Sequence, residues 1–384
     1  MSVKIDSNRF MLNAIQKIHQ LGQSIWYDNI ERRLLKNGEM KKLIESGVSG
    51  ITTNPSIFEK AVASSSDYDE QIISLASAGK NPREIYDELT IQDVLETAEL
   101  LTDVFRTSGG RDGYVSIEVW PEYAHNAAKT IDYARRIWQK INKKNIMIKV
   151  PGTKEGPEAI SALIGEGINV NVTLLFSEEQ YQAVARAYLD GLKTRLKKGG
   201  EISPVNSVAS VFVSRIDTKI DHLLTELTAP IAESLKGKVA VAYMKTIYQA
   251  YKKIFFLDNF APLLKQGANI QRILWASTST KNPAYHDLLY VEPLIGPNSV
   301  NTLPPATLKS LIDYGKTELN PVLPEAGVEK NLDQAHDILN RLSSLNIDIT
   351  SVCQKIQDEG VKAFQDSFDK LIKAVEIKTK TVSA

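Results

Sequence analysis

Eight short apolar segments, each followed by a longer amphipathic stretch, constrain this chain more than any other feature of its sequence. Short apolar segments rich in β-branched residues are typical of buried parallel strands. Eight strands, each followed by a helix, predict an α/β fold of the (β/α)8 TIM-barrel type. An open doubly wound sheet is the alternative, but it usually begins with a glycine-rich turn that the sequence lacks. The strand candidates are 24–28, 50–54, 114–119, 146–150, 168–176, 207–213, 272–277 and 299–303.

Helix signals lie between the strand candidates. Asn126–Ile141 carries apolar residues at helical spacing. Ser177-Glu-Glu-Gln180 forms a capping box that opens another helix. A barrel of this class takes about 250 residues, so a chain of 384 residues leaves room for extra helices. We expect a single barrel domain over 1–384, with additional helices at 1–22, 217–267 and 330–384. Its lysine-rich C-terminal end predicts a solvated tail helix.

Composition excludes several classes of protein. The 46 Lys and Arg residues balance 46 Asp and Glu residues, so neither nucleic acid nor an anionic membrane is an expected partner. The single cysteine, Cys353, excludes internal disulfides and Cys-rich metal sites. No signal-peptide core and no run of about 18 apolar residues occurs, so we expect a cytoplasmic protein. Nucleotide and metal motifs are also absent, and we expect no cofactor and no metal.

Polar side chains lie near the carboxyl ends of most strand candidates. Active sites of barrel enzymes are built at this end. Burying one unpaired charge is costly. Several charged groups around one end of the barrel therefore indicate side chains that act together in one site. Side chains alternate along a strand, so Phe212 shares a face with Ser210. The polar residues are Asp28, Asn54, Glu118, Lys149, Asn171, Thr173, Ser210 and Ser277.

Lys149 is the sharpest of these signals. It lies in the apolar segment IMIKV, where desolvation disfavours the charged ammonium. A neutral amine can attack a carbonyl and form a Schiff base. A structural ion pair with Glu118 or Asp28 is the alternative interpretation, because such pairs also bury charged groups.

Several of these segments together resemble the transaldolase family, in particular its longer, type-2 subgroup. The resemblance rests on GVSGITTNPSIFEKAV (47–62), VSIEVWPE (115–122), IMIKVPGTKEG (146–156), INVNVTLLFS (168–177) and ASVFVSRID (209–217), and ILWASTSTKNPAY and SVNTLPPATL continue it. It implies a Schiff-base enzyme on a (β/α)8 barrel, without metal or organic cofactor. Such enzymes move a dihydroxyacetone unit from fructose 6-phosphate or sedoheptulose 7-phosphate to erythrose 4-phosphate or glyceraldehyde 3-phosphate, in the non-oxidative pentose phosphate pathway.

The resemblance also implies roles for individual residues. Lys149 falls on the Schiff-base lysine, Glu118 on the family's glutamate and Thr173 on its water-holding threonine. Asp28 best matches the general acid/base aspartate. The substrate-binding residues that the resemblance implies are Asn54, Asn171 and Ser210 for the dihydroxyacetone part and Arg215 for phosphate. From the strand pattern we also expect Phe212 in the pocket wall, because it shares a face with Ser210, and Ser277, at the end of the seventh strand, among the substrate-binding residues.

One departure from the family concerns phosphate binding. Shorter transaldolases carry a second phosphate-binding arginine after the seventh strand, and this chain has none there. Lys281 is the nearest cation. It precedes Asn282-Pro283, which predicts a helix start, and a helix N-terminus with a lysine suits phosphate. A solvated lysine is the alternative.

Two other functions remain open at this point. A fructose 6-phosphate aldolase of the same superfamily would carry a non-acidic residue in place of Glu118. A non-catalytic sugar-phosphate-binding barrel would not need the Lys149 amine. In every case the expected partners are sugar phosphates, and the expected assembly is a monomer or a homodimer.

Overall fold

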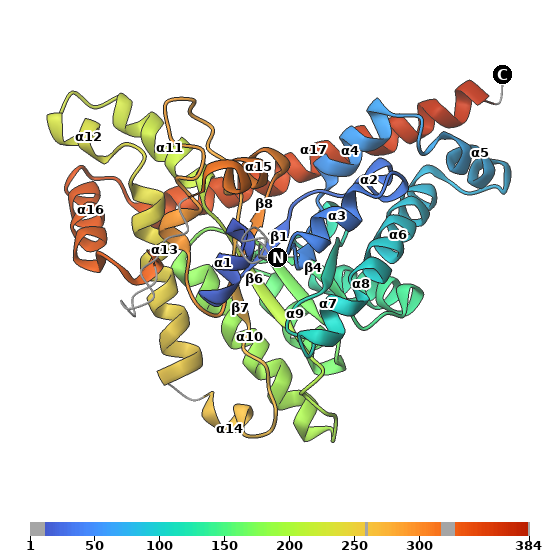
Figure 1. Ribbon diagram of the computed structural model, residues 1–384, viewed down its shortest axis with the longest axis horizontal. Helices are drawn as coiled ribbons and strands as arrows, with labels where there is room; N and C mark the ends of the chain where they lie inside the picture. The colour runs from blue at the N-terminus through green and yellow to red at the C-terminus, as the bar shows by residue number, and fades with distance from the viewer. Residues whose placement is uncertain (1–11, 258–259, 316–326, 383–384) are drawn as a thin grey trace, which may run out of the picture.

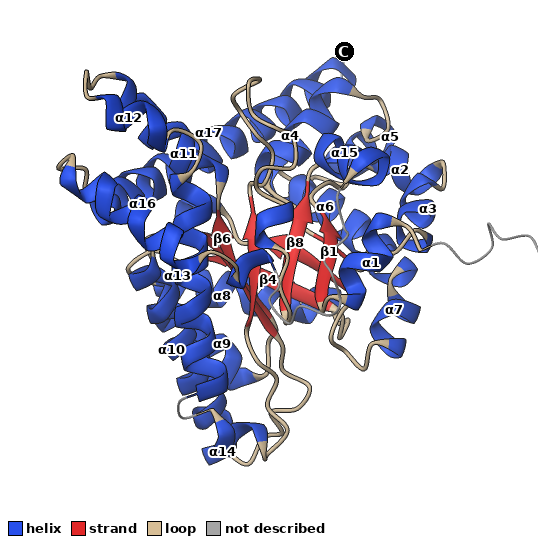
Figure 2. Cartoon of the chain, turned by 60° about the vertical axis from the view of Figure 1, so that its left-hand side comes forward, coloured by secondary structure: helices blue, strands red, loops and turns tan. Residues whose placement is uncertain are grey.

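Eight parallel strands close into a barrel in which each strand pairs with its neighbours in sequence. The computed structural model describes residues 12–257, 260–315 and 327–382. Figure 2 shows the strands at the centre, enclosed by helices. The barrel prediction is confirmed, and each strand candidate overlaps one strand, although β1 begins one residue before its candidate and β4 ends one residue after its candidate. The strands are β1 (Gln23–Tyr27), β2 (Gly50–Ile51), β3 (Tyr114–Glu118), β4 (Ile146–Pro151), β5 (Val170–Leu175), β6 (Ser207–Phe212), β7 (Arg272–Ala276) and β8 (Ser299–Leu303).

Helices connect and surround these strands. Those before β6 are α1 (Ala14–Gln20), α2 (Arg32–Lys36), α3 (Glu39–Glu45), α4 (Pro55–Ser64), α5 (Asp69–Ser77), α6 (Pro82–Leu100), α7 (Thr102–Thr107), η2 (Pro121–Tyr123), α8 (Ala127–Ile141), α9 (Gly156–Glu166) and α10 (Glu178–Lys197). Those after β6 are α11 (Ser214–Thr225), α12 (Pro230–Leu235), α13 (Val239–Lys252), the π-helix η3 (Lys253–Leu257), α14 (Ala261–Leu264), η4 (Glu292–Leu294), α15 (Pro305–Tyr314), η5 (Gly327–Glu329), α16 (Leu332–Ser344) and α17 (Ile349–Val382).

The two helix starts predicted from capping residues are confirmed. The Asn126 side chain accepts a hydrogen bond from the Lys129 N–H and caps α8. Ser177 caps α10 in a capping box with Gln180. The three regions expected to hold extra helices contain α1, then α11 to α14, then α16 and α17, although residues 1–11 lie outside the described part of the chain. The single-domain assignment stays a prediction.

The prediction of a solvated C-terminal tail helix is only partly confirmed: Lys370, Lys373 and Lys380 are exposed, but the helix that carries them is packed against the rest of the protein. The 34-residue helix α17 runs past α11 and α4 (Figure 1). It packs against α4, α5, α6 and α11 and against β5. Lys378 donates a hydrogen bond to the Ser65 carbonyl and contacts Asp69. The helix is held because Phe364, Phe368, Leu371 and Val375 recur at helical spacing and are buried. No helix in the described ranges is long and apolar enough to cross a membrane.

The amino-terminal end of the barrel is filled by an indole and an ion pair. Gly50 leaves room for Trp26, since a Cβ at Gly50 would lie 2.5 Å from the indole ring. Arg272, at the start of β7, pairs with Asp112, which precedes β3. A barrel of this size is a packed core rather than a pore, and active sites of such barrels lie at the opposite, carboxyl-terminal end.

Candidate active site

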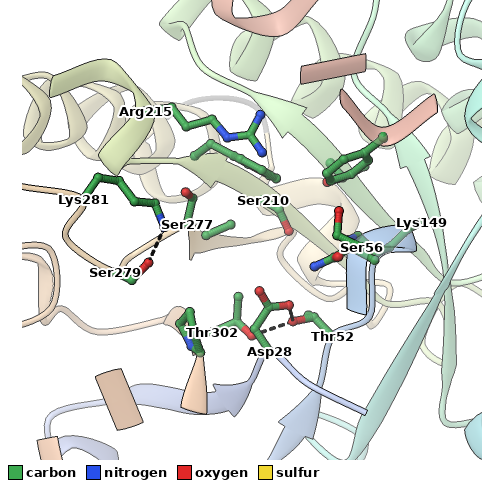
Figure 3. A pocket seen from close by; sticks show the side chains of 16 residues that line it. Asp28, Thr52, Ser56, Lys149, Ser210, Arg215, Ser277, Ser279, Lys281 and Thr302 are labelled. Carbon is green, nitrogen blue, oxygen red and sulfur yellow. Dashed lines mark hydrogen bonds between the residues drawn. The ribbon is translucent and has the colours of Figure 1, made fainter. Parts of the chain in front are cut away.

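A cavity of roughly 190 Å³ lies at the carboxyl-terminal end of the barrel (Figure 3). Nine of the predicted site residues line it, and they come from strands, loops and the first turn of α11, which are far apart in sequence. Glu118 and Asn171 are buried and do not line it, but each contacts a residue that does. The predicted residues along the cavity are Asp28, Asn54, Lys149, Thr173, Ser210, Phe212, Arg215, Ser277 and Lys281.

The Lys149 amine is buried beside a carboxyl group. Glu118 and Lys149 are register partners on β3 and β4, and Glu118 Oε2 lies 3.3 Å from Lys149 Nζ. Lys149 Nζ also donates a 2.7 Å hydrogen bond to the Thr53 carbonyl. Lys149 is only 5% exposed and Glu118 only 6% exposed. This arrangement can supply an amine nucleophile with a proton-transfer group at hand.

The two carboxyl groups of the site hold their protons to higher pH than ordinary acids do. Burial raises the pKa of Glu118, and the nearby Lys149 charge only partly opposes that effect. Burial likewise raises the pKa of Asp28, against the opposing effects of Lys149 and of the hydrogen bond from Thr52. Thr52 Oγ1 donates to Asp28 Oδ1 at 2.6 Å. Carboxyl groups with raised pKa are suited to general acid–base catalysis near neutral pH.

Strand β5 contributes two polar side chains with different surroundings. The Thr173 hydroxyl is buried and has no hydrogen-bond partner among the described residues, so it is available to a water or a substrate atom. The Asn171 amide donates to Ser116 Oγ at 2.9 Å, and its oxygen accepts from Ser210 Oγ at 2.7 Å. Asn171 therefore orients Ser210, and its direct contact with substrate stays a prediction.

Asn54 lies where β2 leads into α4. Its side-chain oxygen accepts a hydrogen bond from the Ile57 N–H and caps the helix. The cap fixes the side chain at the edge of the cavity, and its amide NH2 group is the part left for a ligand. Capping and substrate binding are thus compatible roles for the one residue.

Two cations border the outer part of the cavity. Figure 3 shows Arg215 and Lys281 on the same side of it. Arg215 makes no hydrogen bond or ion pair with another described residue, and burial lowers its pKa. Lys281 donates to Ser279 Oγ at 2.7 Å, and burial and then the Arg215 charge lower its pKa. Two neighbouring cations, of which Arg215 is half-buried and Lys281 exposed, favour an anionic ligand such as phosphate.

The predicted helix start at Asn282-Pro283 is wrong. Asn282 Oδ1 accepts from the Ala284 N–H at 3.0 Å, but the chain continues in turns instead of a helix. Tyr285 and Tyr290 donate hydrogen bonds to Asp221 and Asp217 of α11, which hold this segment against that helix. Lys281 therefore stands on a loop and gains nothing from a helix N-terminus.

Some residues that line the cavity were not predicted. Thr52 and Thr302 follow the same rule as the predicted residues, since each is polar and near the carboxyl end of a strand, and this signal was available. Ser56 and Phe364 carry no such signal, because they lie on helices α4 and α17. Only the fold brings Phe364 to a site whose other residues end by position 304.

Comparisons with known proteins agree with this geometry. The family model for transaldolase/fructose-6-phosphate aldolase matches residues 25–375. A transaldolase of Trichodesmium erythraeum is 43% identical over 97% of this chain and 99% of that protein. A transaldolase of Thiobacillus denitrificans is 44% identical over 94% of this chain and 99% of that protein. A third, of Neisseria gonorrhoeae, is 38% identical over 94% of this chain. With a lysine–glutamate pair in a (β/α)8 barrel and relatives that match nearly its full length, the chain belongs to the transaldolase family.

Proposed function

We propose that Lys149 is the Schiff-base residue through which this transferase moves a dihydroxyacetone unit between sugar phosphates. The observation that carries the proposal is the buried Lys149 amine, 3.3 Å from Glu118 and on a cavity that two cations border. The family supplies the reaction class. Fructose 6-phosphate or sedoheptulose 7-phosphate serves as donor, and erythrose 4-phosphate or glyceraldehyde 3-phosphate as acceptor.

The first half of the reaction forms an iminium ion. The neutral Lys149 amine attacks the C2 carbonyl of the donor and gives a carbinolamine. Glu118 passes a proton to the carbinolamine hydroxyl through a water that Thr173 holds, and water leaves. The partnerless Thr173 hydroxyl and the raised pKa of Glu118 support these roles.

The second half breaks and remakes a carbon–carbon bond. Asp28 takes the proton of the C4 hydroxyl, the C3–C4 bond breaks, and its electron pair moves into the iminium to give an enamine. The first aldose phosphate leaves, while Asn54 and Ser210, oriented by Asn171, hold the three-carbon unit. A second aldose phosphate adds by the reverse steps, so ping-pong kinetics are expected.

Arg215 and Lys281 bind the phosphate in this proposal, and Phe212 and Ser277 form the wall beside it. Remote binding of phosphate positions the reacting carbons. Replacing Lys281 with Gln should raise KM for fructose 6-phosphate by about tenfold, the cost of one charge-assisted hydrogen bond. Lys60→Gln is the matched control, because Lys60 is an exposed cation nearby that does not line the cavity. Equal KM values for the two variants would leave phosphate binding to Arg215 alone.

Reductive trapping tests the proposal most directly. Borohydride added in the presence of fructose 6-phosphate should attach a stable three-carbon unit to the peptide that contains Lys149, as seen by mass spectrometry. Lys149→Ala is the control and should remain unmodified. An unmodified Lys149 in the native protein would refute Schiff-base chemistry at this residue.

A second assay separates transfer from simple cleavage. With fructose 6-phosphate alone, little glyceraldehyde 3-phosphate should accumulate, because the enamine stays on Lys149 until an acceptor arrives. Adding erythrose 4-phosphate should restore turnover. Rapid cleavage without acceptor would make the protein an aldolase instead.

A further inference from the structure

One face of helix α17 covers the active site. Residues 357, 360, 364 and 367 recur every three or four positions and so lie on the same side of the helix. Phe364 lines the cavity, and Ser367 Oγ lies 2.8 Å from Ser56 Oγ, which also lines it. A Cβ added at Gly360 would lie 3.2 Å from both Arg215 Nη1 and Leu174 Cδ2. The helix is therefore a wall of the site, packed closely enough that a methyl group at Gly360 would require its neighbours to move slightly.

The fourth residue of this face, Gln357, bridges the ends of two catalytic strands. It is 3% exposed. Its Nε2 donates to the Gly152 carbonyl at 2.9 Å and to the Leu174 carbonyl at 2.8 Å. Gly152 follows the strand that carries Lys149, and Leu174 directly follows Thr173. One buried amide group thus fixes the ends of β4 and β5 relative to each other.

The backbone that Gln357 holds on β5 is strained. Leu174 has a φ of +60°, a left-handed conformation that is unfavourable for a bulky residue. The pairing of β5 with β6 shifts register between Val172 and Leu175, so Leu174 lies in a β-bulge. Bulges near active sites re-aim side chains, and strained residues keep their conformation only where their surroundings hold them. Here the held bulge lies next to the Thr173 hydroxyl.

We propose that Gln357 is a positioning residue for catalysis. By donating both amide hydrogens to the Gly152 and Leu174 carbonyls, it maintains the bulge that aims the Thr173 hydroxyl at the water near Lys149 and Glu118. The Gly152 N–H completes the link, since it donates to the Thr173 carbonyl at 2.7 Å. This inference rests on the proposed role of Thr173 in the water step.

A double-mutant cycle tests the inference in the full-length protein. Gln357→Met keeps the length of the side chain and removes both donors. It should lower kcat for transfer from fructose 6-phosphate to erythrose 4-phosphate by about tenfold, as a misplaced group does. If Gln357 acts through Thr173, the same change should cost less than about twofold in a Thr173→Val background. Gln365→Met, a change at a half-buried glutamine of the same helix whose amide donates to Asp369 and does not contact β4 or β5, is the matched control and should leave kcat unchanged.

The outcomes distinguish this inference from the proposed function. The positioning role would be overturned if the losses of kcat from Gln357→Met and Thr173→Val multiplied in the variant that carries both changes. It would also be overturned if folded Gln357→Met kept the native kcat. A Thr173→Val variant that keeps full activity would overturn the positioning role and the water step alike. If borohydride and fructose 6-phosphate left Lys149 of the native protein unmodified, the proposed function would instead be refuted. If Gln357→Met does not fold, Gln357→Asn retains a polar amide that is too short to reach both carbonyls, and the same non-additivity is expected.

Discussion

The two ends of the barrel each bury a cation beside a carboxylate, and they differ in what else surrounds the pair. At the amino-terminal end, Arg272 lies 3.0 Å from Asp112. At the carboxyl-terminal end, Lys149 lies 3.3 Å from Glu118. Both pairs consist of side chains that are at most 12% exposed. Burial and distance alone therefore do not separate a structural pair from a reactive one.

The difference lies in the remaining hydrogen bonds. Asp112 also accepts from Trp26 Nε1 at 2.9 Å and from Ser24 Oγ at 2.7 Å, and Arg272 donates to Ser24 Oγ at 2.7 Å. Burial alone would raise the pKa of Asp112, but Arg272 and these hydrogen bonds together hold the pKa below its ordinary value. Glu118 Oε2 has no such hydrogen bond within the described ranges, and its pKa is raised by burial. A fully hydrogen-bonded pair is fixed in its ionic form, whereas an incompletely bonded one can exchange a proton.

The largest expected effect is on activity at the carboxyl-terminal end. Lys149→Met should reduce transfer by at least about 10⁴-fold, because it removes the nucleophile. The free energy of unfolding should change by less than about 2 kcal/mol, since Glu118, with its raised pKa, can take up a proton when its partner is gone. A coupled transfer assay and urea unfolding measure the two quantities. If Lys149→Met lost both activity and stability, the Lys149–Glu118 pair would be structural, like the Arg272–Asp112 pair.

The next effect is on stability at the amino-terminal end. Arg272→Met leaves Asp112 as an unpaired buried carboxylate, and removing one partner of such a pair costs about 3–5 kcal/mol. The folded fraction should keep its specific activity, because Arg272 fills the opposite end of the barrel from the cavity. Urea unfolding and the transfer assay again measure both. A large loss of specific activity without a loss of stability would contradict the division between the two ends.

The sequence predicted these two ends unequally. The strands, Lys149 and most of the residues around it follow from local patterns, because strand period and the carboxyl-end rule place them. The Asp112–Arg272 pair could not be predicted, since Asp112 stands in a loop and only barrel closure brings it to β7. The contacts of Gln357 and Phe364 depend on where α17 crosses the barrel. That crossing is set by packing between segments about 200 residues apart.

The third expected effect is that the stability contributed by Asp112 and the stability contributed by Glu118 change with pH in opposite directions. The pKa of Asp112 is lowered from 3.8, so the stability it contributes is present above that value and is lost as the pH falls through the folded pKa. The deficit of Asp112→Asn relative to the native protein should shrink below about pH 4. The pKa of Glu118 is raised from 4.5, so its contribution is present below that value and is lost as the pH rises. Glu118→Gln should gain stability relative to the native protein as the pH rises above the ordinary glutamate pKa of 4.5.

Urea unfolding at a series of fixed pH values gives the free energy of unfolding of Asp112→Asn and of Glu118→Gln as a function of pH. The native protein measured at each pH is the reference. The direction in which each stability difference changes with pH is the test, and its magnitude is secondary. If the two differences changed in the same direction with pH, the two carboxyl groups would have similar protonation behaviour. The contrast between the ends would then be absent in solution.

The smallest effect compares one hydroxyl at each end. Ser24→Ala removes a hydrogen bond to Asp112 and one from Arg272, and it should cost about 1–2 kcal/mol of stability with no change in the pH profile of kcat. Thr52→Val removes the hydrogen bond to Asp28 that opposes the rise of its pKa. Asp28 must be ionised to accept the C4 hydroxyl proton, so a further rise in its pKa should move the acidic limb of the kcat profile to higher pH. One hydrogen bond of about 1 kcal/mol corresponds to a shift of about 0.7 pH units. If Ser24→Ala moved that limb instead, the amino-terminal pair would be coupled to the chemistry, and its full set of hydrogen bonds would serve catalysis as well as stability.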